Sequence, residues 1–200
     1  PVKFDEVFYD YGMLTTATFT PQDSWDDAYS TPSGGIFRTG GFLYVNDNDA
    51  SAGIRFAVTG ISRGTEIADA WLELYLYRDY GVNCKIYAED VDSSQCWLSG
   101  EYVTDRVRTS AYVVWTTDSG ELGTGKYVES PHFPEVVQEV VDRPNWDETH
   151  IMILLISESS SGYIKFFAYD YGDHIPRLKI QYYDWMASWS WYPLPLSVVS

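Results

Sequence analysis

The sequence predicts an all-β fold: a jelly-roll-like antiparallel β-sandwich with one short helix and an extended apolar C-terminal tail. The prediction rests on short runs that alternate between apolar and polar residues, on an aromatic-rich composition, and on a single helical pattern. The 200 residues include 17 Tyr and 8 Trp, and these residue types fit pleated surfaces better than helices. Many short strands with one helix are typical of a sandwich or jelly roll.

The clearest alternation runs through residues 70–77. Leu72, Leu74 and Leu76 point to one face, and the opposite face receives Trp71, Glu73, Tyr75 and Tyr77. Residues 82–89 repeat the pattern with Tyr87 outward. We therefore expect two adjacent strands to carry an outward patch formed by Trp71, Tyr75, Tyr77 and Tyr87, and exposed aromatics of this kind indicate a partner.

Further strands are expected at residues 36–38, 42–45, 54–58, 111–115, 151–156, 163–168 and 177–183. The first three are at hairpin spacing. Residues 151–156 are continuously apolar, which predicts a central strand covered on both faces. Residues 134–143 predict a helix of about two turns that plugs one end of the sandwich, because Pro134 suits its first turn and Pro144 stops it.

The pattern predicts one sandwich domain over residues 1–184 and a separate tail over residues 185–200. The tail has no charge and is broken by two prolines, so it cannot form a regular central strand. Its aromatic residues are Trp185, Trp189, Trp191 and Tyr192. Either the tail folds back onto its own sandwich or it docks on a neighbouring subunit, and we favour the neighbour slightly, as an assembly arm.

A formal net charge of −16 argues against nucleic-acid binding, because the surface repels phosphate. No apolar run is long enough to insert into a membrane, and no signal peptide is visible. The chain opens with Pro1, a context that favours removal of an initiator Met, although trimming would look the same. If the start is native, the protein reaches the outside by another route, such as a virion.

The chemistry-bearing residues predict no catalytic centre. The three histidines, His132, His150 and His174, stand apart from any nucleophile motif or zinc-type spacing. Cys84 and Cys96 predict free thiols or one optional bridge. Asp23, Asp26 and Asp27 offer clustered oxygens for a structural calcium ion, as does the loop 46–49, but Asp and Asn in turns usually cap the turn, which we rank first.

The middle of the chain resembles the DNRLRE-type β-sandwich modules, which are similar to polysaccharide-binding modules. The resemblance covers about residues 24–183 and is carried by segments 24–29, 64–74, 106–115, 136–146, 169–170 and 176–178. It implies a jelly-roll-like sandwich, a non-catalytic role and an extracellular or particle-surface setting. It also places Glu139, Arg143, Arg108 and Trp115 at motif positions. Glu139 is therefore expected to be a half-buried acceptor that pairs with Arg143 or Arg108.

Three functions follow as hypotheses. The first is a virion or particle-surface structural protein, such as a phage capsid decoration or fibre-associated subunit, which assembles through its tail and aromatic face as a homo-oligomer or with capsid or fibre proteins. The second is a stand-alone carbohydrate-binding module for an acidic or neutral polysaccharide. The third, a hydrolase or lyase, would need a cleft with converging carboxylates.

Overall fold

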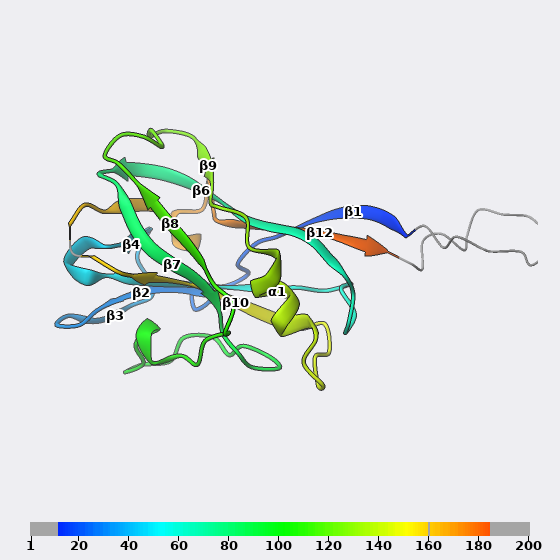
Figure 1. Ribbon diagram of the computed structural model, residues 1–200. Helices are drawn as coiled ribbons and strands as arrows, with labels where there is room; N and C mark the ends of the chain where they lie inside the picture. Colours follow the sequence, from blue (N-terminus) through cyan, green and yellow to red (C-terminus); the bar gives the residue numbers. More distant parts are fainter. Residues whose placement is uncertain (1–11, 160, 185–200) are drawn as a thin grey trace, which may run out of the picture.

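Two antiparallel six-stranded sheets pack face to face in the computed structural model, which describes residues 12–159 and 161–184 (Figure 1). The predicted all-β sandwich is thereby confirmed. The first sheet, here the β6 sheet, has the order β1 (Met13–Phe19), β12 (Arg177–Asp184), β6 (Ile67–Asp79), β11 (Ile164–Phe167), β4 (Phe42–Val45), with β9 (Tyr127–Glu129) also paired to β6. The second, the β10 sheet, has the order β3 (Gly35–Phe37), β2 (Asp27–Thr31), β5 (Ser51–Ala57), β10 (His150–Ser157), β7 (Val82–Ala88), β8 (Val113–Thr117).

The main core lies between the two sheets. Leu72, Leu74 and Leu76 project into it from β6, and Cys84 and Ile86 project from β7, all fully buried. The alternation expected for residues 70–77 and 82–89 is therefore confirmed on its apolar side. Burial raises the pKa of the Cys84 thiol, and both Cys84 and the half-buried Cys96 are free thiols.

A smaller core lies on the outer face of the β10 sheet, beneath the chain that runs from β7 to β8. This connection contains the 3-10 helix η2 (Val103–Asp105) and the fully buried Trp97, which packs on Met152 and Leu154 of β10. β10 is consequently buried on both faces, as its apolar run predicted.

The helix α1 (Pro134–Val141) begins at the predicted proline and packs its four valines into the main core beside β6 and β7. Gln138 Oε1 accepts a hydrogen bond of 2.8 Å from the amide of Ile67 at the start of β6. The helix therefore closes one end of the sandwich. It is shorter by two residues than predicted, because Asp142 already forms its C-cap. No helix in the described part of the chain is long and apolar enough to span a membrane.

The hairpins expected among residues 36–58 are wrong. β3 pairs with β2, β4 pairs with β11, and β5 pairs with β2 and β10. The chain changes sheet after β3, through Gly40 and Gly41, and again after β4, where Asn46 adopts φ 76° and the 3-10 helix η1 (Asp47–Asp49) follows. Strands β2 and β9 were not predicted, and β1 lies in the N-terminal stretch, whose strand-like pattern in the sequence is weak. A third 3-10 helix, η3 (Tyr169–Tyr171), follows β11.

Candidate ligand-binding face

Aromatic side chains gather on the outer face of the β6 sheet, on the side opposite the main core. Tyr75 and Tyr77 point outward from β6 because the leucines between them point inward. Phe42 and Tyr44 do the same on β4, and Lys165 of β11 lies between the two strands, paired in register with Tyr44 and Arg78. Three neighbouring strands therefore present one surface.

The rings on this surface contact one another. Phe167 is central: its ring centroid lies 3.7 Å from that of Tyr171, 5.2 Å from Phe42 and 5.3 Å from Tyr75. His174 stacks on Tyr75 at 4.0 Å with an interplanar angle of 8°. His174 holds this position with φ 61°, a left-handed conformation that is uncommon outside glycine and that often marks a functional segment.

Lys165 supplies a positive charge in the middle of the aromatic face. Its Nζ lies 3.9 Å from the ring centroid of Phe42, 4.9 Å from Tyr44 and 5.0 Å from Tyr77. Among the described residues no carboxylate forms a salt bridge with it. Arg78, 4.4 Å from the Tyr77 ring, likewise has no acidic partner there. Lys165 and Arg78 are partners in register, so two basic side chains without an ion pair lie together on this face.

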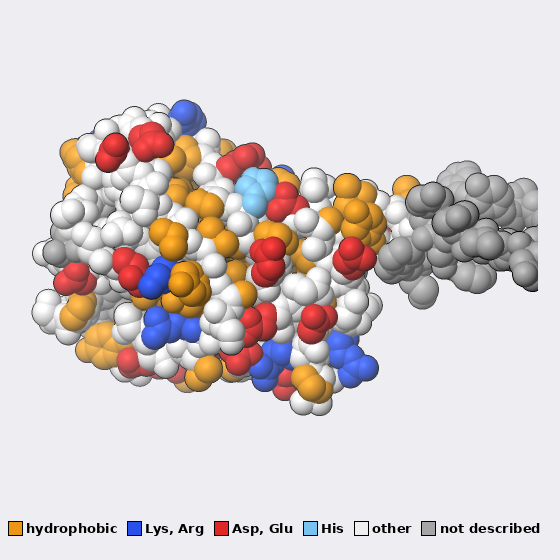
Figure 2. Space-filling model, viewed as in Figure 1, with side chains coloured by type: hydrophobic (Ala, Val, Ile, Leu, Met, Phe, Trp, Pro, Cys, Tyr) orange, Lys and Arg blue, Asp and Glu red, His pale blue; other side chains and the backbone are white. Residues whose placement is uncertain are grey.

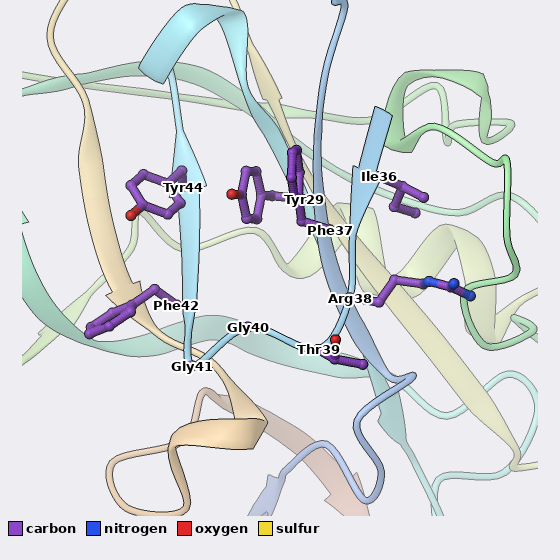
Figure 3. A pocket seen from close by; sticks show the side chains of 9 residues that line it. All are labelled: Tyr29, Ile36, Phe37, Arg38, Thr39, Gly40, Gly41, Phe42 and Tyr44. Carbon is purple, nitrogen blue, oxygen red and sulfur yellow. The ribbon is translucent and has the colours of Figure 1, made fainter. Parts of the chain in front are cut away.

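A cleft of about 450 Å³ adjoins this face where the edge of the β6 sheet meets that of the β10 sheet (Figure 3). Phe42 and Tyr44 form one wall, and Tyr29 and Phe37 form the other. Tyr29 stacks on Phe37 at 4.7 Å and lies 5.0 Å from Tyr44. Gly40 connects β3 to β4 and adds no side chain to the opening. The full lining of the cleft is Tyr29, Ile36, Phe37, Arg38, Thr39, Gly40, Gly41, Phe42 and Tyr44.

The cleft combines flat apolar walls with phenol hydroxyls. Burial, followed by the nearby Tyr44 and Asp47, raises the pKa of Tyr29, so its hydroxyl stays protonated and able to donate a hydrogen bond. Phe37 is 43% exposed, which is high for a phenylalanine. Such a cleft is suited to a flat ring with apolar faces and polar edges.

The structure separates the four residues predicted to form one outward patch. Trp71, Tyr75 and Tyr77 share the outer face of the β6 sheet, whereas Tyr87 lies on the outer face of the β10 sheet, because β6 and β7 belong to different sheets. Tyr87 contacts Tyr112 at 5.3 Å. Figure 2 shows hydrophobic and basic side chains side by side over β7.

Trp71 stands at the opposite end of β6 from the cleft. His132 stacks on its indole at 5.1 Å, and the His132 Nδ1 lies 2.6 Å from Asp69 Oδ2. Glu73, between Trp71 and Tyr75 on the same face, pairs with Arg177 at 3.3 Å. This ion pair separates the Trp71 pair from the continuous rings around Phe167.

The pairing expected for Glu139 is wrong. Its two carboxylate oxygens accept hydrogen bonds from the amides of Ser110 and Ala111 at 2.8 and 2.9 Å, because this side of α1 faces backbone rather than an arginine. Arg143, at the end of the helix, instead pairs with Asp90 and, at 2.8 Å, with Asp92. The other two motif residues lie elsewhere. The Arg108 guanidinium lies 5.4 Å from the centroid of the Tyr87 ring, and Trp115 is buried in the main core.

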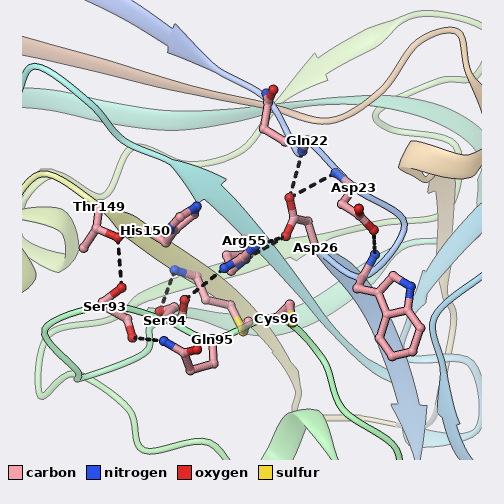
Figure 4. Close-up of polar contacts among 12 residues, drawn as sticks. Gln22, Asp23, Asp26, Arg55, Ser93, Ser94, Gln95, Cys96, Thr149 and His150 are labelled. Carbon is pink, nitrogen blue, oxygen red and sulfur yellow. Dashed lines mark hydrogen bonds and ion pairs between the residues drawn. The ribbon is translucent and has the colours of Figure 1, made fainter.

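The three aspartates considered for calcium have separate surroundings. Asp26 Oδ1 pairs with Arg55 at 2.6 Å, and its Oδ2 accepts amide hydrogen bonds from Gln22 and Asp23 (Figure 4). Asp27 is buried and accepts a hydrogen bond from the Tyr169 amide at 2.7 Å. Asp23 Oδ1 accepts the Trp25 amide. No group of three metal-binding side chains occurs among the residues described, and calcium binding stays a prediction.

Arg55 also binds the Ser94 carbonyl at 3.3 Å, which holds the start of the β7–β8 connection to the sheet. His150, at the same place, has its pKa lowered by burial and then by Arg55. Its Nδ1 lies 2.9 Å from the Thr149 hydroxyl, which in turn lies 2.9 Å from the Ser93 hydroxyl.

The predicted assembly residues Trp185, Trp189, Trp191 and Tyr192 lie outside the described residues. Conversely, sequence reasoning missed Phe42, Tyr44, Lys165 and Phe167 as parts of a site. The alternation of Phe42-Leu43-Tyr44-Val45 gave a signal, since two aromatics share a face there. The pairing of β4 with β11 and β6 was required to combine that signal with Tyr75 and Tyr77.

No protein-family model matches the chain, and no curated protein matches it either.

Proposed function

We propose that the protein is a non-catalytic module that binds a polysaccharide on the outer face of the β6 sheet. The observation that carries this proposal is the row of contacting rings from Tyr75 through Phe167 and Phe42 to the Tyr29–Tyr44 cleft. Sugar rings present C–H faces that stack on aromatic side chains, and their hydroxyl groups take hydrogen bonds at the edges. A row of rings next to a cleft provides both over several sugar units.

The charges favour an acidic polysaccharide over a neutral one. Lys165 lies among three rings without an acidic partner in the described residues, and Arg78 stands next to it. A carboxylate on the ligand would form a charge-assisted hydrogen bond with this ammonium while its ring stacks beside it. The chain as a whole has a net charge of −16 and would repel the same ligand elsewhere, so binding would be confined to this face.

Titration calorimetry with a soluble polyuronate and with a neutral glucan tests the proposal. We expect Tyr44→Ala to weaken polyuronate binding about tenfold or more, which corresponds to about 1.4 kcal/mol. Lys165→Met should reduce the preference for the acidic polymer over any neutral one. Tyr112→Ala, which removes a 49% exposed tyrosine just before β8 of the other sheet, is the matched control and should bind normally. Absence of binding to all polymers, or full binding by Tyr44→Ala, would contradict the proposal.

The virion or particle-surface subunit stays a second candidate. Its main support in the sequence, the aromatic segment 185–200, lies outside the described residues. One feature of the described chain favours assembly independently: Met13 and Leu14 of β1 are each 55% exposed, beside the last described strand (Figure 1). Cross-linking of the chain to isolated capsid or fibre proteins, compared with binding to glycans, distinguishes the two candidates.

A further inference from the structure

The strand β1 forms a long open edge of the β6 sheet. Within the described residues it pairs only with β12, through all seven residues from Met13 to Phe19. The other strands that end a sheet are shorter: β4 has four residues, β3 has three and β8 has five. Exposed edges of this length invite pairing with another strand.

Backbone groups along this edge face away from the sheet. The Tyr183 amide donates to Glu66 on the β6 side at 3.1 Å, so Tyr183 does not hydrogen-bond its register partner Leu14. Because hydrogen-bonded and non-hydrogen-bonded pairs alternate in an antiparallel ladder, Leu14, Thr16 and Thr18 direct their N–H and C=O groups to the open edge. These outward backbone groups recur at every second residue, which is the spacing that a further antiparallel strand requires.

The edge also lacks the residues that normally prevent such pairing. Residues 11–22 contain no charged side chain, and β1 itself contains no Pro, Gly or Lys. Acidic side chains are spread over the face of the molecule shown in Figure 2, and the chain carries −16 overall. The side chains of β1 therefore place no like charges opposite each other when two copies approach edge to edge.

We propose that two copies of this chain pair antiparallel through β1 and join their β6 sheets into one continuous sheet. A two-fold axis at Thr16 places Thr16 opposite Thr16 and Leu14 opposite Thr18, and every one of these residues already offers its backbone groups to the edge. The exposed Leu14 side chain then packs beside Thr18 of the other copy on the outer face. Such an interface is closed and isologous.

The dimer has a consequence for ligand binding. With the two-fold axis perpendicular to the sheet, the outer faces of both β6 sheets lie on the same side. The two aromatic faces would then bind one long polymer together, with an avidity above that of either face alone. The dimer itself does not depend on the proposed function, because its own measurement is the mass in solution.

Sedimentation equilibrium of the full chain tests the dimer. We expect the mass of two copies for the unchanged protein, and at least tenfold weaker association for Thr16→Asp, which places two like charges opposite each other. Val114→Asp is the matched control: it adds the same charge at a 52% exposed position of the edge strand β8 and should leave the dimer intact.

Thr16→Cys provides a second test that does not depend on weakening the fold. Residues in a directly opposed hydrogen-bonded pair lie about 5.5 Å apart at Cα, which permits a disulfide. In a Cys96→Ser background, mild oxidation should yield a covalent dimer of Thr16→Cys and none of the chain with Thr16, because the remaining Cys84 is buried. The proposal is overturned if the unchanged protein is a monomer at every concentration, or if the dimer survives Thr16→Asp. It is also overturned if the protein is a monomer that Thr16→Asp destabilises, because its own chain would then cover the edge.

Discussion

The buried carboxyl of Asp27 links the two sheets at the residue scale. It begins β2, and its Oδ2 accepts the amide of Tyr169, in the 3-10 helix after β11. Its Oδ1 has no hydrogen-bond partner among the described residues. Burial raises the pKa of Asp27 to about 7, and the neighbouring Asp170 and Asp26 act in the same direction against the Tyr169 hydrogen bond. The folded protein therefore holds this proton more tightly than the unfolded chain.

This pKa predicts how stability depends on pH. The stabilising contribution of the proton is complete below the unfolded pKa of about 4 and is lost as the pH rises through about 7. Asp27→Asn removes the titration, so the variant should gain stability relative to the unchanged protein between about pH 4 and about pH 8, by at most about 4 kcal/mol. Urea unfolding of both proteins at both pH values measures this gain in stability. If the free energies of unfolding of the two proteins differ by the same amount at both pH values, the prediction is contradicted.

At the element scale, the β7–β8 connection depends on close packing of Trp97 against β5. A Cβ at Gly53 would lie 2.3 Å from Cζ2 of Trp97, which is closer than two carbon atoms can approach. The indole can therefore pack here only because residue 53 has no side chain. Gly53→Ala should destabilise the protein by roughly 1–3 kcal/mol and increase hydrogen exchange across residues 89–112. Gly40→Ala, whose Cβ would meet nothing closer than 3.8 Å, is the control. Equal exchange in both variants would refute this role.

The elements show what the sequence could and could not predict. Most strands and α1 were predictable because alternation and proline positions are local signals. The separation of Tyr87 from Trp71 was not, because it depends on which sheet each strand joins, and nothing in 82–89 distinguishes one sheet from the other. The three-residue strand β9 gave too short a pattern, and Trp97 lies in a connection whose burial comes only from the packing of η2 and β10.

The partners of Glu139 show the same limit. The resemblance implied that Glu139 is half-buried, and in the structure Glu139 is half-buried on α1. The resemblance also implied its acceptor role, but its donors are the backbone amides of Ser110 and Ala111, just before β8. Side-chain charges are visible in a sequence, whereas free backbone amides are not, so the arginines were the only donors that the pattern could suggest.

At the scale of the whole molecule, a net charge of −16 predicts a strong effect of salt. Raising sodium chloride from about 10 mM to about 100 mM shortens the screening length from about 30 Å to about 10 Å. Mutual repulsion among the carboxylates should fall, and the unfolding midpoint should rise by a few degrees, about 2–4 °C for each kcal/mol gained. Part of this gain in stability should be offset at Lys165 and Arg78, because salt also screens their attraction to the acidic surroundings.

The same measurement tests calcium if calcium chloride and sodium chloride are compared at equal ionic strength. Because Arg55 already neutralises Asp26 and the Asp27 carboxyl resists ionisation, we expect the two salts to raise the midpoint equally. A specific site would add a stabilisation that grows with the logarithm of calcium concentration. Such an additional rise, abolished by Asp23→Asn and reversed by a chelator, would show instead that a cation rearranges this segment and binds there.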